Sequence, residues 1–268
     1  WSSDVCSSDL DINQVLGVVG SRYQVVQNKE AFTFFDSIVG EGQAIFETAG
    51  ALGNGERIFI TAKLPEYFEV GGKKDLIEQY LFLTSSHDGS GAITCAFTPV
   101  RIVCQNTLGM AMNSKSNAFY IRHTTNATEK LKQAHELMGI VDITKKEMNE
   151  LFNAMAKKSI VDDKLKELIK QTLATKETLA ILEQDGEASQ RFYNKISDVY
   201  EYSMSAPSQQ TESCKGTLFG YYNAITGYYQ NVKTYKSDES KLVSIMEGEA
   251  HRNSERALTL AKLSYKPS

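Results

Sequence analysis

Hydrophobic and polar residues alternate through much of the first half of the chain, with the period of half-buried β-strands. The clearest run is IFITAKL at 58–64. It follows Asn54-Gly55, a dipeptide typical of two-residue hairpin turns because both central positions need positive φ. Two further β-rich runs, IEQYLFLTSS and GAITCAFTPV, flank the turn-like segment HDGSG. We therefore predict hairpins at 54–55 and 87–91.

Other short runs extend the strand-rich part. QVLGVVGSRYQVV holds two β-rich stretches around Gly20-Ser21, which predicts another hairpin, and AFYIRHT predicts one more strand. Asn28 is a suitable N-cap for one early helix over KEAFTFFDSIVGEG. The run 99–112 fits two structures: a helix with Pro99 near its first turn, or a strand that leads into a helix.

The period changes to that of helices from Asn126 onward. NATEKLKQAHELMGIV begins with Asn126 and Glu129 at capping-box spacing, and TKKEMNELFNAMAKK repeats the spacing with Thr144 and Glu147. Four more segments have helical periodicity: DDKLKELIKQTLA, SQRFYNKISDVYEYS, KGTLFGYYNAITGYYQNV and EAHRNSERALTLAKL. SAPSQQTES, around Pro207, is polar and predicts a linker at 205–213.

This order predicts an α+β fold: a hairpin-rich, mainly antiparallel sheet with one early helix, followed by a helical C-terminal half. We expect a sheet-rich domain over 11–125 and a helical region over 126–268 that packs on it. The first ten residues, WSSDVCSSDL, resemble the in-frame translation of a common sequencing adapter. We expect 1–10 to be an artefactual leader, and the chain proper to be a fragment that starts near Asp11.

Charge is unevenly distributed in a chain of net charge −4. Residues 99–170 hold 12 Lys or Arg against 8 Asp or Glu, whereas residues 11–98 hold 6 against 11. A basic middle segment suits an anionic partner, and it suits ordinary solvated helix faces equally well. No apolar run approaches the roughly 20 residues that cross a bilayer, so no membrane association is expected.

The cysteines and the nucleotide signatures exclude several classes of protein. Outside the leader, Cys95, Cys104 and Cys214 are widely spaced and odd in number, which favours buried free thiols over disulfides or a zinc site. A nucleophilic Cys104, with His123 as its base, is the less favoured interpretation. The chain has neither a Walker-type loop nor G-x-G-x-x-G after a strand, so no cofactor is predicted. It also has no Cys-x-x-Cys pair, so no metal is predicted.

His87 and Asp88, in SSHDGSGA, are the candidates for acid–base catalysis. A base must reach its nucleophile and be oriented by a third group, and adjacent residues on a strand face opposite ways. The same residues are what a tight turn requires, so a turn or ligand loop is the favoured interpretation.

The candidate nucleic-acid contacts follow the basic segment. Arg122 and His123 would present donors beside the N-terminus of a predicted helix, where anions are stabilised. A structural salt-bridge cluster is the alternative. The full predicted set is Arg101, Asn106, Lys115, Arg122, His123 and Lys130. The later tyrosines, such as Tyr221 with Tyr228, could stack on bases, but their seven-residue spacing favours helix packing.

Several of these strings together carry a family resemblance. LGVVGSRYQVVQNKEAF, ETAGALGNGERIFITAKLP, YLFLTSSHDGSGAITCAFTPVRIVCQNTL and IRHT resemble the family called domain of unknown function 932, found in phages and plasmids, and GTLFGYYNAITGYYQN resembles its C-terminal helices. The resemblance covers roughly residues 15–265 and implies a mobile-element protein in the host bacterial cytoplasm. Family members usually begin with a segment that carries a Trp-His-Gly-Leu-Gly-like motif, which this sequence lacks.

Three functions remain open from the sequence. The first is binding of nucleic acid, single-stranded DNA above all, in replication or recombination. The sequence is also compatible with a homo-oligomer. The second is a hydrolase or nuclease that uses His87, Asp88 and His123. The third is a protein that interacts with a host factor through its helical half.

Overall fold

A computed structural model describes residues 5–8, 15–39, 44–72, 75–101, 106–107, 118–123, 134–246 and 248–265. The chain divides into two compact units, each described by itself below. Unit 1 comprises Trp1–Tyr67, Glu78–Thr98 and Met112–Lys146, and unit 2 comprises Phe68–Ile77, Pro99–Ala111 and Glu147–Ser268.

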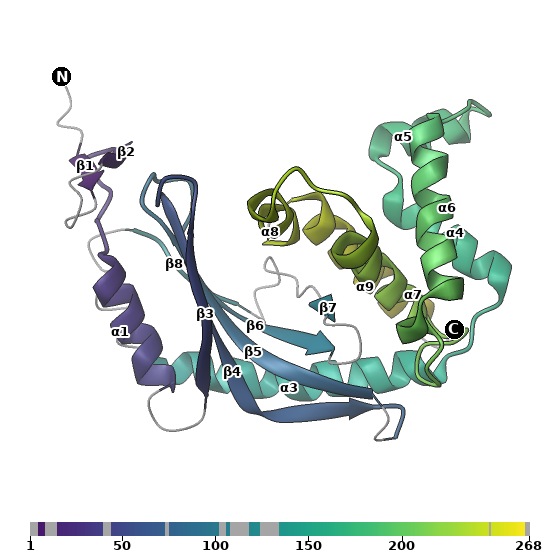
Figure 1. The fold of residues 1–268 in the computed structure, drawn as a ribbon, viewed down its shortest axis with the longest axis horizontal. Helices are drawn as coiled ribbons and strands as arrows, with labels where there is room; N and C mark the ends of the chain where they lie inside the picture. The colour runs from purple at the N-terminus through teal and green to yellow at the C-terminus, as the bar shows by residue number, and fades with distance from the viewer. Residues whose placement is uncertain are drawn as a thin grey trace. The chain divides into compact units, whose positions relative to one another are not determined.

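An antiparallel sheet supplies most of the strands of unit 1 (Figure 1). Its strands follow one another in the order β3-β4-β5-β6-β7, and β8 also pairs with β6. Its last strand, β7, and the adjoining ends of β4, β5 and β6 belong to unit 2. A separate two-stranded sheet pairs β1 with β2. The strands are β1 (Val5–Ser8), β2 (Val15–Val19), β3 (Ile45–Leu52), β4 (Arg57–Val70), β5 (Asp75–Ser86), β6 (Ile93–Arg101), β7 (Asn106–Thr107) and β8 (Ala118–Ile121).

The predicted hairpins at 54–55 and 87–91 are confirmed. β3 turns into β4 through the four residues 53–56, with Leu52 opposite Arg57. The predicted two-residue turn is wrong, because Gly53 and Gly55 have positive φ but Asn54 does not. β5 and β6 are joined by 87–92. The alternation also holds: Ile58, Ile60 and Ala62 are buried, because successive side chains on a strand face opposite sides of the sheet.

The predicted hairpin around Gly20-Ser21 is wrong. β2 ends at Val19, and residues 23–27 form no strand. β2 instead pairs with β1, which lies within residues 1–10. Val26 is nevertheless only 1% exposed; its apolar character reported burial rather than strand pairing. Helix α1 (Asn28–Val39) follows, as predicted.

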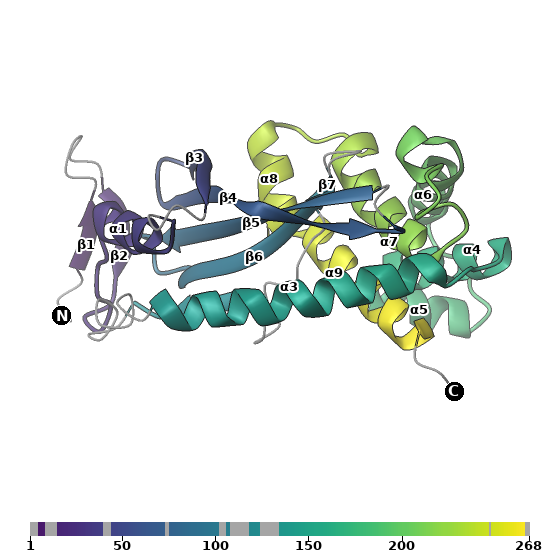
Figure 2. The same cartoon turned by 90° about the horizontal axis from the view of Figure 1, so that it is seen from below.

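Helix α3 (Ala134–Lys157) is continuous where two helices were predicted (Figure 2). The supposed cap at Thr144 lies inside it, because nothing between 140 and 147 breaks a helix and a capping residue also tolerates a helix interior. The alternative for 99–112 is decided in part: β6 runs through Pro99 to Arg101, so no helix begins there. The capping pair Asn126 and Glu129 lies outside the described residues.

Unit 2 is a helical assembly built around one wholly buried helix. Every residue of α7 is buried, and α7 contacts α4, α6 and α9. A Cβ at Gly220 would collide with the carbonyl oxygen of Cys214, so glycine permits the close approach there. The remaining helices are α4 (Asp162–Leu173), α5 (Lys176–Glu183), α6 (Gln190–Ser205), η1 (Pro207–Gln209), α7 (Leu218–Gly227), η2, a π-helix (Tyr228–Val232), α8 (Asp238–Met246) and α9 (Glu249–Tyr265).

Burial shows which of the tyrosines and cysteines have a structural role. Tyr221, Tyr222 and Tyr229 are each at most 1% exposed, so these rings pack the helices of unit 2 as predicted. Cys95 and Cys214 are buried free thiols, and burial raises the pKa of Cys95 to about 12. Cys104 lies outside the described residues. Among the helices that the structure describes, none is both long enough and apolar enough to cross a membrane.

Candidate functional site

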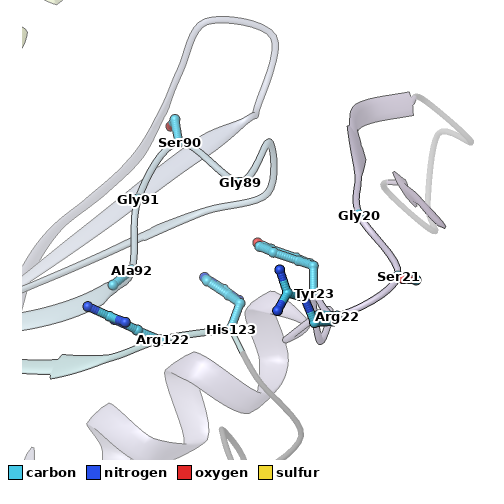
Figure 3. A pocket seen from close by; sticks show the side chains of 10 residues that line it. All are labelled: Gly20, Ser21, Arg22, Tyr23, Gly89, Ser90, Gly91, Ala92, Arg122 and His123. Carbon is cyan, nitrogen blue, oxygen red and sulfur yellow. The ribbon is translucent and has the colours of Figure 1, made fainter. Parts of the chain in front are cut away.

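An open hollow of about 690 Å³ lies within unit 1, where three chain segments meet (Figure 3). One segment follows β2, one belongs to the β5–β6 connection, and one follows β8. Its lining is Gly20, Ser21, Arg22, Tyr23, Gly89, Ser90, Gly91, Ala92, Arg122 and His123. Distant parts of the sequence therefore form one concave surface.

Glycine allows the first two segments to approach. A Cβ at Gly17 would lie 2.6 Å from the Cα of Asp88, a distance that real Cβ atoms do not reach. Gly89, in the facing turn, has a φ of +77°, which residues other than glycine rarely adopt. The contact between β2 and the β5–β6 connection places Gly20 to Tyr23 beside the turn.

Tyr23 is held from two sides. Its hydroxyl donates a hydrogen bond to the carbonyl oxygen of Ser86, at 2.7 Å. Its ring stacks on the ring of His123, with centroids 4.5 Å apart and an interplanar angle of 14°. Burial, and then the charge of Asp88, raise the pKa of Tyr23 to about 12. Tyr23 is therefore a neutral, fixed ring in the wall of the hollow.

His123 is buried and neutral at pH 7. Its Nδ1 lies 3.2 Å from the carbonyl oxygen of Gln24, and because a carbonyl only accepts, this nitrogen is the donor. The backbone N–H of Gln24 in turn donates to the carbonyl oxygen of His123, at 3.0 Å. Burial, with a smaller contribution from the charge of His87, lowers the pKa of His123. Within the described part of the chain, its Nε2 acceptor has no hydrogen-bond partner.

His87 and Asp88 engage different partners. His87 is 4% exposed, and its Nε2 donates to Asn28 Oδ1, at 2.6 Å, on the first residue of α1. Asp88 is exposed, and its Oδ1 accepts the backbone N–H of Ser90, at 2.9 Å. Burial opposes the shift, but the hydrogen bonds from Ser90 and the charge of Arg57 lower the pKa of Asp88. His87 thus anchors the start of α1, and Asp88 stabilises the turn between β5 and β6.

Arg22 and Arg122 supply the positive charge of the hollow. Both residues are exposed, and Figure 3 shows their guanidinium groups beside Tyr23 and Ala92 respectively. Within the described ranges, neither side chain forms an ion pair or a hydrogen bond. The described acids of unit 1 therefore leave both guanidinium groups available to an anion.

The predicted nucleic-acid residues are only partly described. Arg122 and His123 line the hollow together. The side chains of Arg101 and Asn106, and the whole of Lys115 and Lys130, lie outside the described residues. Within the described residues, no group of three His, Cys, Asp or Glu is arranged to hold a metal ion.

The sequence interpretation missed Arg22 and Tyr23. Both fall in the segment that was assigned to a hairpin, where an arginine and a tyrosine are ordinary strand residues. The available signal was Gly20-Ser21 followed directly by a cation and an aromatic ring. That pattern indicates a binding site only when the fold places Arg122 and His123 beside it.

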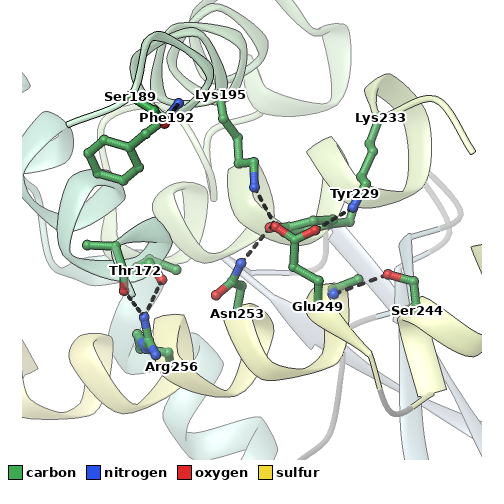
Figure 4. Close-up of polar contacts among 12 residues, drawn as sticks. Thr172, Ser189, Phe192, Lys195, Tyr229, Lys233, Ser244, Glu249, Asn253 and Arg256 are labelled. Atoms are coloured by element: carbon green, nitrogen blue, oxygen red, sulfur yellow. Dashed lines mark hydrogen bonds and ion pairs between the residues drawn. The ribbon is translucent and has the colours of Figure 1, made fainter. Parts of the chain in front are cut away.

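A second polar cluster lies in unit 2, where one carboxylate pairs with two lysines (Figure 4). Glu249, at the start of α9, pairs with Lys195 of α6 and with Lys233, at 2.6 Å for the latter. Tyr229 donates to the same carboxylate at 3.2 Å, and Asn253 donates to the Tyr229 hydroxyl at 2.5 Å. Partial burial opposes the shift, but the two lysines lower the pKa of Glu249 to about 2. The cluster ties helices together.

Fold and site define an α+β protein whose sheet-bearing unit carries an open hollow with two exposed arginines and a stacked tyrosine–histidine pair. The family model described as Domain of unknown function (DUF932) matches residues 15–254. The chain belongs to this family. No curated protein and no solved structure matches it.

Proposed function

We propose that unit 1 binds single-stranded nucleic acid, with Arg22 and Arg122 contacting phosphate groups in the hollow. The observation that carries the proposal is that two exposed guanidinium groups, without partners in the described part of the chain, line one concave surface. Guanidinium groups pair with phosphate through parallel N–H donors, and such contacts supply most of the sequence-independent affinity for nucleic acids.

The walls of the hollow suit an unpaired strand. Gly20, Gly89 and Gly91 keep side chains out of the way, so a ligand can approach the backbone closely. A volume of about 690 Å³ falls within the range of sites that enclose small organic molecules. A short stretch of unpaired strand fits such a space, whereas a stiff duplex presents only its outer backbone to it.

The phage and plasmid setting implied by the family resemblance agrees with this function, because mobile elements expose single strands when they replicate and recombine. A hydrolase or nuclease built on His87 and Asp88 has less support, since the two side chains bond to Asn28 and to the Ser90 backbone. We therefore expect binding without strand cleavage.

The test measures binding of a fluorescent single-stranded DNA 20-mer by anisotropy across a salt series. We expect Arg22→Gln and Arg122→Gln each to weaken binding about five- to tenfold and to reduce the slope of log K against log salt by about 0.7, the value for one phosphate contact on a single strand. Arg191→Gln is the matched control, because Arg191 is an exposed arginine on α6 in unit 2. If the unaltered chain fails to bind the 20-mer at low salt, the proposal is discarded.

A further inference from the structure

We infer that the Tyr23 ring is a stacking platform for a nucleobase, so that the hollow takes one nucleotide of the strand with its base on Tyr23 and its phosphates on Arg22 and Arg122. This inference rests on the proposed function and goes beyond it. With phosphate contacts alone, the protein would recognise only the charged backbone of the strand. With stacking on Tyr23, it also binds the bases.

The pairing of rings with cations points to a nucleotide. Arg22 immediately precedes Tyr23, and Arg122 immediately precedes His123. The two rings stack on one another, so each ring of the pair carries an arginine next to it in the chain. A ligand that matches this arrangement has a flat, uncharged ring and negative charges at its side. A nucleotide within a strand has both.

The Tyr23 ring is fixed before any ligand arrives. Its hydroxyl is bonded to Ser86, and its ring is supported by His123. His123 is itself held by hydrogen bonds in both directions with Gln24. A ring that is already ordered loses little rotamer entropy on binding. In this arrangement His123 is a positioning residue, because it acts through Tyr23.

Exposure distinguishes Tyr23 from the structural tyrosines of unit 2. Tyr221, Tyr222 and Tyr229 are buried between helices and have no face that a ligand could reach. Tyr23 is partly exposed and lines the hollow (Figure 3). The neighbouring wall is formed by glycines and short side chains, from Gly89 to Ala92, which leaves room for a ring beside Tyr23.

The experiment compares two ligands that carry the same phosphates. One is a single-stranded DNA 20-mer, and the other is an abasic 20-mer with the same backbone. Base–aromatic stacking is sequence-tolerant and strong enough that we expect the unaltered chain to bind the normal strand about tenfold more tightly than the abasic one. A 2-aminopurine base in the strand should also lose fluorescence on binding, because stacking quenches it.

Variants separate stacking from phosphate contact. Tyr23→Leu should bind the normal and the abasic strand equally, at the affinity that the unaltered chain has for the abasic one. Tyr23→Phe should keep most of the preference, because the ring remains while only the bond to Ser86 is lost. Tyr193→Leu, on an exposed ring of α6, is the control and should change nothing.

Equal binding of both strands by the unaltered chain overturns the inference, and it does so without any variant that must fold. Such a result leaves the proposed function standing if Arg22→Gln and Arg122→Gln still weaken both ligands. Failure of the unaltered chain to bind either strand overturns the proposed function instead.

Discussion

Arg22-Tyr23 and Arg122-His123 are two dipeptides from distant parts of the sequence whose rings meet at 4.5 Å. The second dipeptide was predicted as an anion contact, because donors before a helix are a local pattern. The first was not, because its role depends on a neighbour about a hundred residues further along. The sequence thus predicted one of the two arginines, Arg122, and did not predict the stacked pair of Tyr23 and His123.

A substitution at Gly17 tests whether the close approach of β2 to Asp88 is needed to form the hollow. Gly17→Ala would place a methyl group 2.6 Å from the Asp88 Cα, a backbone atom that cannot rotate away. We expect a loss of about 1–3 kcal/mol in the free energy of unfolding, typical of overpacking, and weaker oligonucleotide binding. Chemical denaturation followed by circular dichroism measures the first quantity.

Gly20→Ala is the matched control, because a Cβ at Gly20 meets nothing within 4 Å. Its stability should stay within about 0.5 kcal/mol of the unaltered chain, as for ordinary surface substitutions. Gly20→Ala is a control for stability alone, because Gly20 lines the hollow. Equal losses of stability from the two substitutions would show that the approach of β2 to Asp88 is not what fixes the hollow.

Secondary-structure elements were predictable where the signal was local. Asn54-Gly55 favours a turn between two strands, and the structure has a hairpin there, although its turn has four residues and not the predicted two. Thr144 with Glu147 is also a local signal, yet α3 passes through it without a break. A capping pair can begin a helix but does not force one to begin, since a helix that has already formed can extend through it.

The Glu249 cluster makes α9 dependent on charge. Glu249→Gln removes both ion pairs, and we expect a loss of about 1–2 kcal/mol at pH 7, less than the full shift implies because the carboxylate is partly exposed to solvent. The pKa of Glu249 is lowered from 4.5 to about 2. Its stabilisation is therefore complete above about pH 5 and decreases as the pH falls towards 2.

Urea unfolding at pH 7, 4 and 3 checks this expectation. The difference between the unaltered chain and Glu249→Gln should be largest at pH 7 and smallest at pH 3. Glu201→Gln, an exposed glutamate on α6, should show a small difference that hardly changes with pH. A Glu249→Gln difference that grows on acidification would contradict the assigned role.

The whole molecule has a net charge of −4, so a polyanion is repelled at long range and must be attracted locally. A measurement of where on the chain the oligonucleotide binds therefore tests the proposed function directly. Hydrogen exchange measured by mass spectrometry, with and without the single-stranded 20-mer, should show added protection at residues 20–23, 89–92 and 122–123. Helices α4 to α9 should exchange unchanged.

Protection confined to the helices of unit 2 would move the binding surface away from the hollow. Within those helices, α7 should be the slowest to exchange with or without ligand, because every one of its residues is buried. That slow exchange serves as an internal standard for the measurement, since the most buried elements open only on extensive unfolding.

The α+β class and the order of elements, sheet before helices, follow from the chain's periodicity, because alternation and helical spacing are properties of neighbouring residues. The pairing of β2 with β1 and the shape of the hollow depended on contacts that the local pattern did not predict. Gly17 against Asp88, and Tyr23 against His123, are such contacts. They arise only when strand pairing and burial bring those segments together, which no local pattern encodes.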